Sequence, residues 1–280
     1  MRVLVRPGKH PDSRVPQACE QVPVGITDVE QLTHAIAESS AVIYCAGSVR
    51  GRDLKDFATA NISGVQAILL TLEKLSSHSG KAPPLLLLSS LAASRPELSD
   101  YAHSKHDGEQ LLRAKPSLPW TILRPPAVYG PGDREMLPLL KMIRRGLLAR
   151  VGPPDQRLSL LHVDDLASAV VAWLCASQRC QGNTYAIDDG TPGGYSWKAM
   201  GEAVSDRRLR TLGVPRSLLG LIARTNLLFS GLMGYQPMLT PGKVRELLQP
   251  DWLCDNSEFS DATGWKPTLD LKLGVEQLFQ

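Results

Sequence analysis

Residues 84–90 read Pro-Leu-Leu-Leu-Leu-Ser-Ser, an unbroken apolar run that ends in two hydroxyl groups. A short run without polar alternation is typical of a strand that helices cover on both faces, as in parallel sheets. A segment with helical spacing follows at residues 101–114 and stops at Lys115-Pro116, because proline cannot continue a helix. We therefore predict a buried parallel strand, a hydroxyl-bearing loop and a helix, in that order.

The same alternation extends to both sides of this unit. Short Val/Ile/Leu-rich runs at residues 2–6, 41–46 and 120–124 predict further strands. Helical segments lie between them at residues 28–38, where Asp28 can cap the first turn, and at residues 53–75. Strands joined by crossover helices predict an α/β fold with a Rossmann-like, doubly wound parallel sheet. We assign residues 1–133 to this nucleotide-binding domain.

The pattern changes in the second half of the chain. Residues 134–149 have helical spacing, Gly152-Pro-Pro154 forms a hinge, and a strand near 158–161, a helix at 164–176 and a strand at 184–187 follow. Many Gly and Pro residues then interrupt residues 190–280, which contain short helices at 241–248 and 271–279. We predict that residues 134–280 are mainly a smaller, mostly helical substrate-binding lobe, with 158–187 returning to the sheet.

Composition excludes several classes of protein. The chain has 280 residues, 43% of them hydrophobic, with 31 lysines and arginines against 28 acids. A net charge of +3 is too balanced for a phosphate-backbone binder, so we expect no nucleic-acid partner and assign the cluster Arg207-Arg208-Leu209-Arg210 to a solvated edge. Five scattered cysteines without a C-x-x-C pair give no support for disulfides or zinc, so we predict no metal site and expect a reducing, cytoplasmic location.

Two segments bear on membranes. The N-terminus lacks the apolar stretch of a signal peptide, so we do not expect secretion. Residues 213–235 are apolar, but Arg216, Arg224 and Asn226 interrupt them, and a bilayer span needs roughly 18 uninterrupted apolar residues. Residues 214–235 can line an apolar substrate pocket or rest on a membrane surface as a peripheral contact; the alternative is a helical pair packed within the lobe.

Tyr101-Ala-His-Ser-Lys105 places a phenol and an ammonium one turn apart on one helix face. A nearby cation lowers the pKa of a tyrosine from its reference value of about 10, which makes the phenol a usable proton donor and acceptor. The strand that ends at Ser89-Ser90 precedes this helix, and parallel sheets form sites beyond the carboxyl ends of their strands. A surface Tyr–Lys pair beside a serine-rich turn is the alternative.

Taken together, the motifs resemble those of the extended short-chain dehydrogenase/reductases, also called NAD-dependent epimerase/dehydratases. The matching segments run in the family's order over nearly the whole chain: Cys45-Ala46-Gly47, Asn61-Ile-Ser-Gly64, Ser89-Ser90, Tyr101-x-x-x-Lys105, Arg124-Pro-Pro-Ala-Val-Tyr-Gly-Pro-Gly and His162-Val-Asp-Asp-Leu-Ala167. Residues 239–247 and Gly264-Trp-Lys-Pro are similar to members related to 3β-hydroxysteroid dehydrogenases and nucleoside-diphosphate-sugar epimerases.

The resemblance implies roles for individual residues. Tyr101 is the expected general acid/base, Lys105 lowers its pKa and binds the nicotinamide ribose, and Ser90, with Ser89 as the fallback, hydrogen-bonds the reacting oxygen. Further residues are expected at the cofactor because they lie at the ends of predicted strands or in the helix at residues 53–75. These residues are Arg6, Cys45, Ala46, Gly47, Asn61, Pro125 and Val128.

Other polar residues fit structural roles. Asp164 and Asp165 after His162 suit a helix cap better than chemistry, because acids satisfy free N–H groups at a helix start. Asn61 fits a core position as well as a site contact. His103 and His106 lie three apart on a helix, but the sequence shows no partner that would complete a metal site.

The chain departs from the family pattern at its beginning. Members open with a strand, a Gly-x-x-Gly-x-x-Gly turn and a helix that holds the cofactor pyrophosphate, whereas the first strand here resembles the family's second. This first βα unit is therefore expected to be missing, either because the start is misplaced or because cofactor binding has been lost. Arg6 and Lys9, with no acid before Asp12, favour NADP modestly over NAD, because a cation suits the 2′-phosphate.

The leading hypothesis is an NAD(P)-dependent oxidoreductase or epimerase that acts at a secondary alcohol or ketone of a small molecule, such as a sugar nucleotide or a sterol-like compound. The rival hypothesis is a catalytically silent cofactor-binding or scaffold protein on the same fold. Ser90, Tyr101 and Lys105 favour the enzyme, whereas the missing phosphate-binding turn favours the rival.

We expect the 280-residue chain to bind nicotinamide cofactors weakly. In the family's strand order 3-2-1-4-5-6, the missing strand lies between residues 2–6 and 41–46. Its loss opens a gap of roughly 10 Å, so these two strands must close up or leave backbone groups unpaired. Fluorescence titration should give a weaker than micromolar affinity for NADPH and a still weaker one for NADH. Micromolar NADPH affinity would contradict this expectation.

Overall fold

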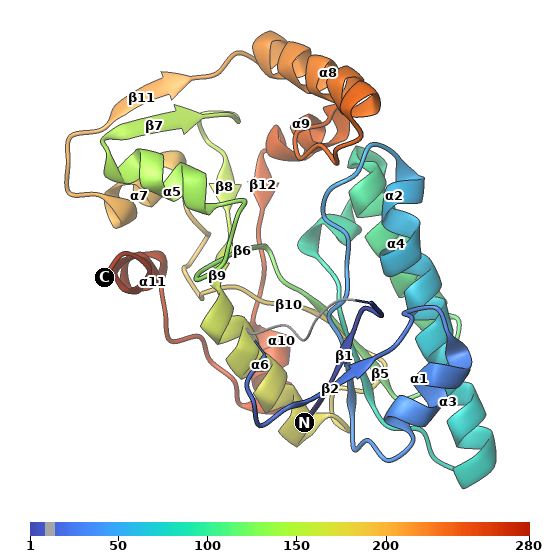
Figure 1. Cartoon of the computed structure of the whole chain (residues 1–280). Helices are drawn as coiled ribbons and strands as arrows, with labels where there is room; N and C mark the ends of the chain where they lie inside the picture. Colours follow the sequence, from blue (N-terminus) through green and yellow to red (C-terminus); the bar gives the residue numbers. More distant parts are fainter. Residues whose placement is uncertain (9–14) are drawn as a thin grey trace.

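The computed structural model describes residues 1–8 and 15–280. Its central element is a parallel sheet of order β10-β5-β4-β3, which confirms the predicted α/β class (Figure 1). The strands are short: β3 (Val42–Tyr44), β4 (Leu85–Leu88), β5 (Trp120–Arg124) and β10 (Thr184–Ala186). The two central strands, β4 and β5, are nearly continuously buried. Leu86, Ile122 and Leu123 have no exposed surface, as expected for strands that are covered on both faces.

A second parallel pair, β1 (Arg2–Val5) and β2 (Glu20–Pro23), lies apart from this sheet. The sequence analysis missed β2, because Glu-Gln-Val-Pro has no apolar run that would indicate a strand. Within residues 1–8 and 15–280, β1 and β3 do not pair with each other, so the two strands have not closed up. Leu4 on β1 and Ile43 on β3 each remain 37% exposed.

Helices α1, α3 and α4 cover one face of the sheet. Helix α1 (Val29–Ile36) begins after Asp28, whose carboxylate accepts a hydrogen bond from the Gln31 N–H at 3.0 Å, as the capping prediction requires. The predicted helix over residues 53–75 is instead three consecutive segments: α2 (Leu54–Ala58), the π-helical turn η1 (Thr59–Ser63) and α3 (Gly64–Ser79). Helix α4 (Asp100–Arg113) packs against all three.

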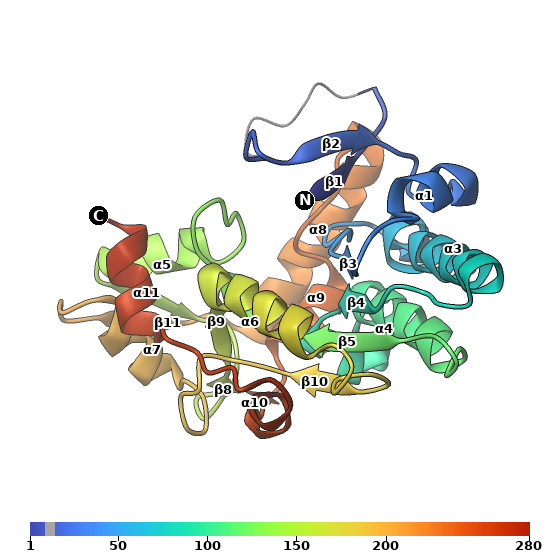
Figure 2. The same cartoon turned by 90° about the horizontal axis from the view of Figure 1, so that it is seen from below.

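Helices α6 (Val163–Ala176) and α10 (Ser257–Thr263) pack on the opposite face, as the view from below shows (Figure 2). Trp173 on α6 and Phe259 on α10 are fully buried beside Leu86 and Leu123 of the sheet. Phe259 also makes an edge-on ring contact with Trp265 at 5.6 Å. The C-terminal part of the chain therefore completes the core of the central sheet.

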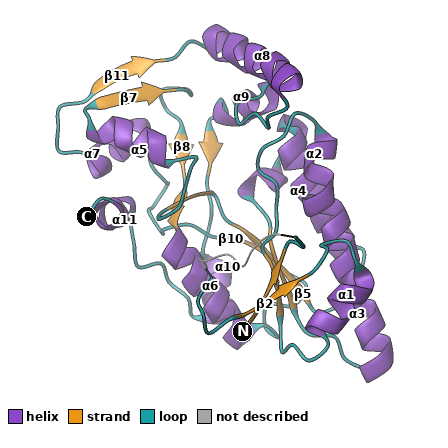
Figure 3. Ribbon diagram, in the orientation of Figure 1, coloured by secondary structure: helices purple, strands orange, loops and turns teal. Residues whose placement is uncertain are grey.

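The remaining elements form a second region beside the sheet (Figure 3). Its strands make three parallel pairs: β6 (Ala127–Tyr129) with β9 (Leu160–His162), β7 (Leu147–Arg150) with β11 (Arg210–Gly213), and β8 (Arg157–Leu158) with β12 (Asp251–Trp252). Its helices are α5 (Leu137–Arg144), α7 (Trp197–Val204), α8 (Arg216–Met233), α9 (Pro241–Leu247) and α11 (Leu271–Leu278). Two 3₁₀ turns, η2 (Leu91–Ser94) and η3 (Pro96–Leu98), connect β4 to α4.

The predicted helix over residues 134–149 is wrong at its C-terminal end. Helix α5 stops at Arg144, and Gly146 then adopts a φ of 90°, a left-handed conformation that glycine tolerates. Residues 147–150 pair with β11, a partner about 60 residues away that local spacing cannot reveal. The segment 214–235 is likewise one long helix, α8, and not a pair of helices.

The contact between α4 and η1 predicts opposite effects for two glycine substitutions. A Cβ on Gly108 would lie closer than 3.0 Å to the backbone oxygen of Asn61, whereas a Cβ on Gly220 in α8 would meet open space. We expect Gly108→Ala to lower the free energy of unfolding by about 1–3 kcal/mol through overpacking. Gly220→Ala should raise it by roughly 0.5–1 kcal/mol, because alanine is the better helix former. Urea denaturation measures both, and equal effects would contradict the packing argument.

Candidate active site

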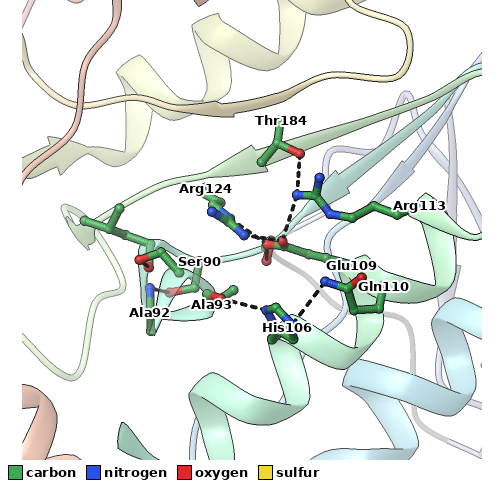
Figure 4. Close-up of polar contacts among 12 residues, drawn as sticks. Ser90, Ala92, Ala93, His106, Glu109, Gln110, Arg113, Arg124 and Thr184 are labelled. Carbon is green, nitrogen blue, oxygen red and sulfur yellow. Dashed lines mark hydrogen bonds and ion pairs between the residues drawn. The ribbon is translucent and has the colours of Figure 1, made fainter. Parts of the chain in front are cut away.

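The loop after β4 is tied to the end of β5. The Ser89 N–H donates to the Leu123 carbonyl at 2.8 Å, and the Leu91 N–H donates to the Pro125 carbonyl at 2.9 Å. Ser90 caps η2, and its Oγ accepts a hydrogen bond from the Ala92 N–H at 3.2 Å (Figure 4). These bonds fix the Ser90 hydroxyl at the carboxyl edge of the sheet.

Tyr101 lies in the first turn of α4, where Ser99 caps the helix by accepting from the Ala102 N–H at 3.0 Å. The Ser90 hydroxyl lies near the Tyr101 phenol, and the Tyr101 ring meets Phe57 edge-on at 5.9 Å. Burial raises the pKa of Tyr101 above its ordinary value, while the Ser90 hydroxyl and the Lys243 ammonium oppose this shift. Tyr101 therefore keeps its proton at neutral pH.

Lys105 lies one turn further along α4 and is only 8% exposed. Its Nζ donates to the Leu88 carbonyl at 3.1 Å, at the end of β4. Burial lowers the pKa of Lys105 to about 8, although the Glu109 carboxylate partly offsets this. The contributions that lower the Tyr101 pKa come from Ser90 and Lys243, so a lowering by Lys105 stays a prediction.

Ser89 and Ser90 face different partners. The Ser89 hydroxyl donates to Oε1 of Glu109 at 2.5 Å. Glu109 is fully buried and also accepts from Arg124 Nε at 2.9 Å, while Arg113 bridges from Glu109 to Thr184 (Figure 4). Ser89 thus belongs to an internal network, and Ser90 is the serine beside Tyr101.

Asn61 is a core polar residue at the edge of the site. It is 2% exposed, its Oδ1 accepts from the Ser48 N–H at 3.1 Å, and its Nδ2 donates to the Ser48 carbonyl and to Ser104 Oγ. The amide therefore clamps the loop that follows β3. A Cβ on Gly47 would lie 3.1 Å from Lys105 Nζ and 3.3 Å from Asn61 Oδ1, so glycine keeps this space open.

The other residues expected at the cofactor are more spread out. Cys45 is exposed and Ala46 is half-buried after β3, and Pro125 is buried where it holds the Ser90 loop. Val128 lies in β6, paired with Leu161 of β9. Arg6 is exposed directly after β1, on the separate strand pair. Lys9 lies outside the described residues.

The histidines have structural partners. His162 caps α6, because its Nδ1 accepts from the Asp164 N–H at 3.3 Å, whereas the Asp165 carboxylate binds the backbone of residues 268 and 269. His103 does have a carboxylate neighbour, Asp107, one turn away at 3.4 Å, which the sequence analysis missed. Across residues 1–8 and 15–280, no group of three His, Cys, Asp or Glu side chains could hold a metal ion.

Two charged residues on α9 were not predicted as part of the site. Lys243 Nζ lies 5.9 Å from the centre of the Tyr101 ring and donates to Glu246 Oε2 at 2.7 Å. Glu246 is buried and also accepts from the Ser99 hydroxyl at the start of α4. The sequence signals a helix start at Thr240-Pro241, but it does not show that this helix packs on η3 and meets the Ser99 cap of α4, roughly 140 residues earlier.

A pocket of about 180 Å³ opens where these elements meet. Figure 1 shows α9 beside the ends of α2 and α4, with α8 above it. The pocket is lined by Phe57 and Tyr101, by Lys243 and Thr240 of the α9 start, and by Leu227 and Met238 near α8. Tyr101 thus presents its side chain to a partly apolar cavity.

The unusual pKa of Lys105 can be tested by NMR. Substituting Glu109 with Gln removes the carboxylate that raises this pKa while the burial remains, so we expect the Lys105 pKa to fall below about 8. Titration of ¹³Cε-labelled lysines measures it, with Lys105→Arg to assign the signal. Glu202→Gln, at an exposed carboxylate on α7, serves as the control. An unchanged or higher Lys105 pKa in the Glu109 variant would contradict the assignment.

The chain is similar to several characterised reductases and dehydrogenases. It is 33% identical to ceramide reductase of Caulobacter vibrioides over 216 residues, which cover 75% of this chain and 64% of that protein. It is 26% identical to 3β-hydroxysteroid-dehydrogenase/decarboxylase isoform 1 of Arabidopsis thaliana over 198 residues, 63% of this chain and 44% of that protein. The chain thus spans less than two thirds of the length of these relatives.

The fold is shared with solved enzymes. The structure of UDP-glucuronic acid 4-epimerase from Bacillus cereus, in complex with UDP-glucuronic acid and NAD, superposes with a TM-score of 0.67. The match covers 95% of this chain and 82% of that one at 20% identity. The model of the NAD-dependent epimerase/dehydratase family matches residues 3–187, the segment that carries Ser90, Tyr101 and Lys105. With two thirds of its length matched, the chain belongs to the NAD-dependent epimerase/dehydratase family.

Proposed function

We propose that the chain is an NAD(P)-dependent oxidoreductase that acts on a ketone or secondary alcohol of an apolar, lipid-like molecule. The observation that carries this proposal is the Tyr101 side chain, which lies beside the Ser90 hydroxyl at the wall of a partly apolar pocket. Lys105 on the same helix lies at the end of β4. The arrangement supplies a proton donor and an oriented hydroxyl for one reacting oxygen.

The electrostatics of Tyr101 favour reduction. Because burial raises its pKa, the phenol is protonated at neutral pH and is ready to donate to the oxygen of a ketone. Ser90, held as the cap of η2, can hydrogen-bond the same oxygen. The nearby Lys243 ammonium stabilises the phenolate that forms after the proton has left.

The residues at the sheet edge fit the nicotinamide end of the cofactor. Gly47 leaves space beside Lys105 that any larger residue would fill, and Lys105 is predominantly an ammonium at pH 7. When bound, the nicotinamide supplies or accepts the hydride. Lys105 would hold the ribose hydroxyls next to Tyr101. The exposed Arg6 supports a preference for NADP over NAD.

The pocket favours a neutral, apolar substrate over a sugar nucleotide. Two of the cations that line it pair with carboxylates: Lys243 with Glu246, and Arg52 with Asp56 at 3.4 Å. Arg245 keeps its charge, because its Nε donates to a neutral backbone carbonyl at 2.7 Å. A diphosphate would therefore find two of these three cations already paired. Two of the relatives are named for ceramide and for hydroxysteroid chemistry, which supports the same class of substrate.

A turnover assay tests this proposal. At millimolar NADPH, the chain should reduce a long-chain β-keto lipid or a 3-ketosteroid and leave a UDP-sugar unchanged. Tyr101→Phe removes the proton donor but little volume, so we expect a loss of about 10²- to 10⁴-fold in kcat. Its NADPH affinity, measured by titration, should remain within twofold of that of the unmodified chain.

Tyr185→Phe is the matched control, because Tyr185 lies in β10 and packs on Phe259 away from the pocket. Its activity should stay within twofold. Equal activity of the Tyr101 variant and the unmodified chain would overturn the assignment of Tyr101. Cofactor binding without reduction of any ketone would favour the silent protein.

A further inference from the structure

Helix α8 carries an apolar surface that does not face the rest of the chain. Its outward side chains are large and well exposed, with Leu228 at 71% and Leu232 at 84%. The remaining members of this outer face are Leu218, Leu221, Ile222, Phe229 and Met233, all at least 44% exposed. Figure 1 shows α8 at the margin of the molecule, in contact with α9. Such a concentration of exposed apolar side chains marks an interaction surface.

The outer face is distinct from the face that packs on the protein. Leu219 and Ala223 are buried against Val244 of α9, and Ser230 is buried on the same side of the helix. At about 100° per residue, the outer apolar side chains occupy an arc of about 140° on the other side. Helix α8 therefore has one apolar stripe that packs against the rest of the chain and a second, wider stripe that faces outward.

Polar groups on and beside this arc have hydrogen-bond partners within the chain. Thr225 is the one polar side chain among the outer apolar positions, and its hydroxyl donates to the carbonyls of Leu221 and Ile222 at 3.1 and 3.0 Å. Asn226 and Tyr235 also bond to each other and to the backbone. The outer face can therefore enter an apolar medium without leaving these groups unpaired.

The stretch of sequence that contains α8 is rich in basic residues. From Arg207 to Arg245 the sequence has seven basic residues and no acid, whereas the rest of the chain has 24 basic residues and 28 acids. Arg224 is exposed on the flank of the helix beside the apolar arc, and Arg216 is exposed at the first residue of the helix. An apolar arc with flanking arginines suits the headgroup and acyl boundary of an anionic membrane. A second copy of the chain would bring like charges together.

We propose that α8 docks on the surface of an anionic lipid bilayer through its outer face, with Arg216 and Arg224 at the headgroups. The helix would lie in the plane of the surface, because no helix in the described part of the chain is long and apolar enough to cross a bilayer. Docking does not depend on catalysis.

Docking would also bring the pocket to the membrane. Leu227 of α8 and Met238, five residues beyond its end, line the cavity that contains Tyr101. A lipid-like substrate could then pass from the bilayer to Tyr101 without crossing water. This delivery rests on the proposed function, whereas docking itself does not.

Vesicle sedimentation with the full chain tests the docking. At 0.1 M salt, the chain should pellet with phosphatidylcholine vesicles that contain 30% phosphatidylserine, and at least tenfold less with phosphatidylcholine alone. The double variant Leu228→Glu/Leu232→Glu should lose at least tenfold of the binding, and Arg216→Gln/Arg224→Gln should lose the preference for anionic vesicles. Circular dichroism checks that each variant is folded.

The control places the same charges on other exposed apolar residues. Val171 and Leu174 on α6 are 60% and 43% exposed, so Val171→Glu/Leu174→Glu should bind as the unmodified chain does. Equal loss in this control, or no pelleting of the unmodified chain with anionic vesicles, overturns the proposal.

A dimer that light scattering detects in the unmodified chain but not in the Leu228→Glu/Leu232→Glu variant would assign the outer face to a second copy instead. Reduction of a water-soluble ketone, which should be unchanged in this variant, separates failure of docking from failure of the proposed enzyme.

Discussion

The buried carboxylate of Glu109 fixes the side of α4 that faces the sheet. It accepts hydrogen bonds from Ser89 at the end of β4 and from Arg124 at the end of β5, so one charge joins two strands and a helix. A carboxylate without exposed surface requires such partners, since removing one would leave an uncompensated charge. On α4, Tyr101 lies two helical turns before Glu109, and Lys105 lies one turn before it. The ion pair between Glu109 and Arg124 therefore also directs Tyr101 and Lys105 to the same edge of the sheet.

The two ammonium groups of the candidate site have separate acceptors. Lys105 approaches from within α4 and is held by the Leu88 carbonyl, whereas Lys243 approaches from α9 and is held by Glu246. Each ammonium therefore has its own acceptor, and their mutual repulsion is reduced. Burial around Tyr101 favours the neutral phenol, and the Lys243 ammonium favours the phenolate. In the proposed reaction, the balance between these effects makes Tyr101 a proton donor whose charged form is still accessible.

Much of the central sheet could be predicted from the sequence. Residues 84–90 and 120–124 are short apolar runs, and their order with the helices between them determines a parallel α/β sheet. Ser90 and Tyr101 could be placed together because strand ends share one edge. The pairing of β7 with β11 and the contact of α9 with η3 could not be predicted, because they join segments far apart in sequence and leave no local pattern. Lys243 and Glu246 were missed for that reason. Strand β2 was missed because its residues have little intrinsic preference for strands.

The separation of β1 and β2 from the main sheet gives the two ends of the candidate cofactor site different local stabilities. A two-stranded sheet has few backbone bonds of its own, and residues such as Val22 and Val24 attach this one to the main core. Arg6 therefore belongs to a unit that can open locally without unfolding the rest of the chain. Tyr101 and Lys105, in contrast, are set against the most deeply buried strands. Binding at the Arg6 end would have to order a loosely held element, whereas the end at Tyr101 and Lys105 is organised before any ligand arrives.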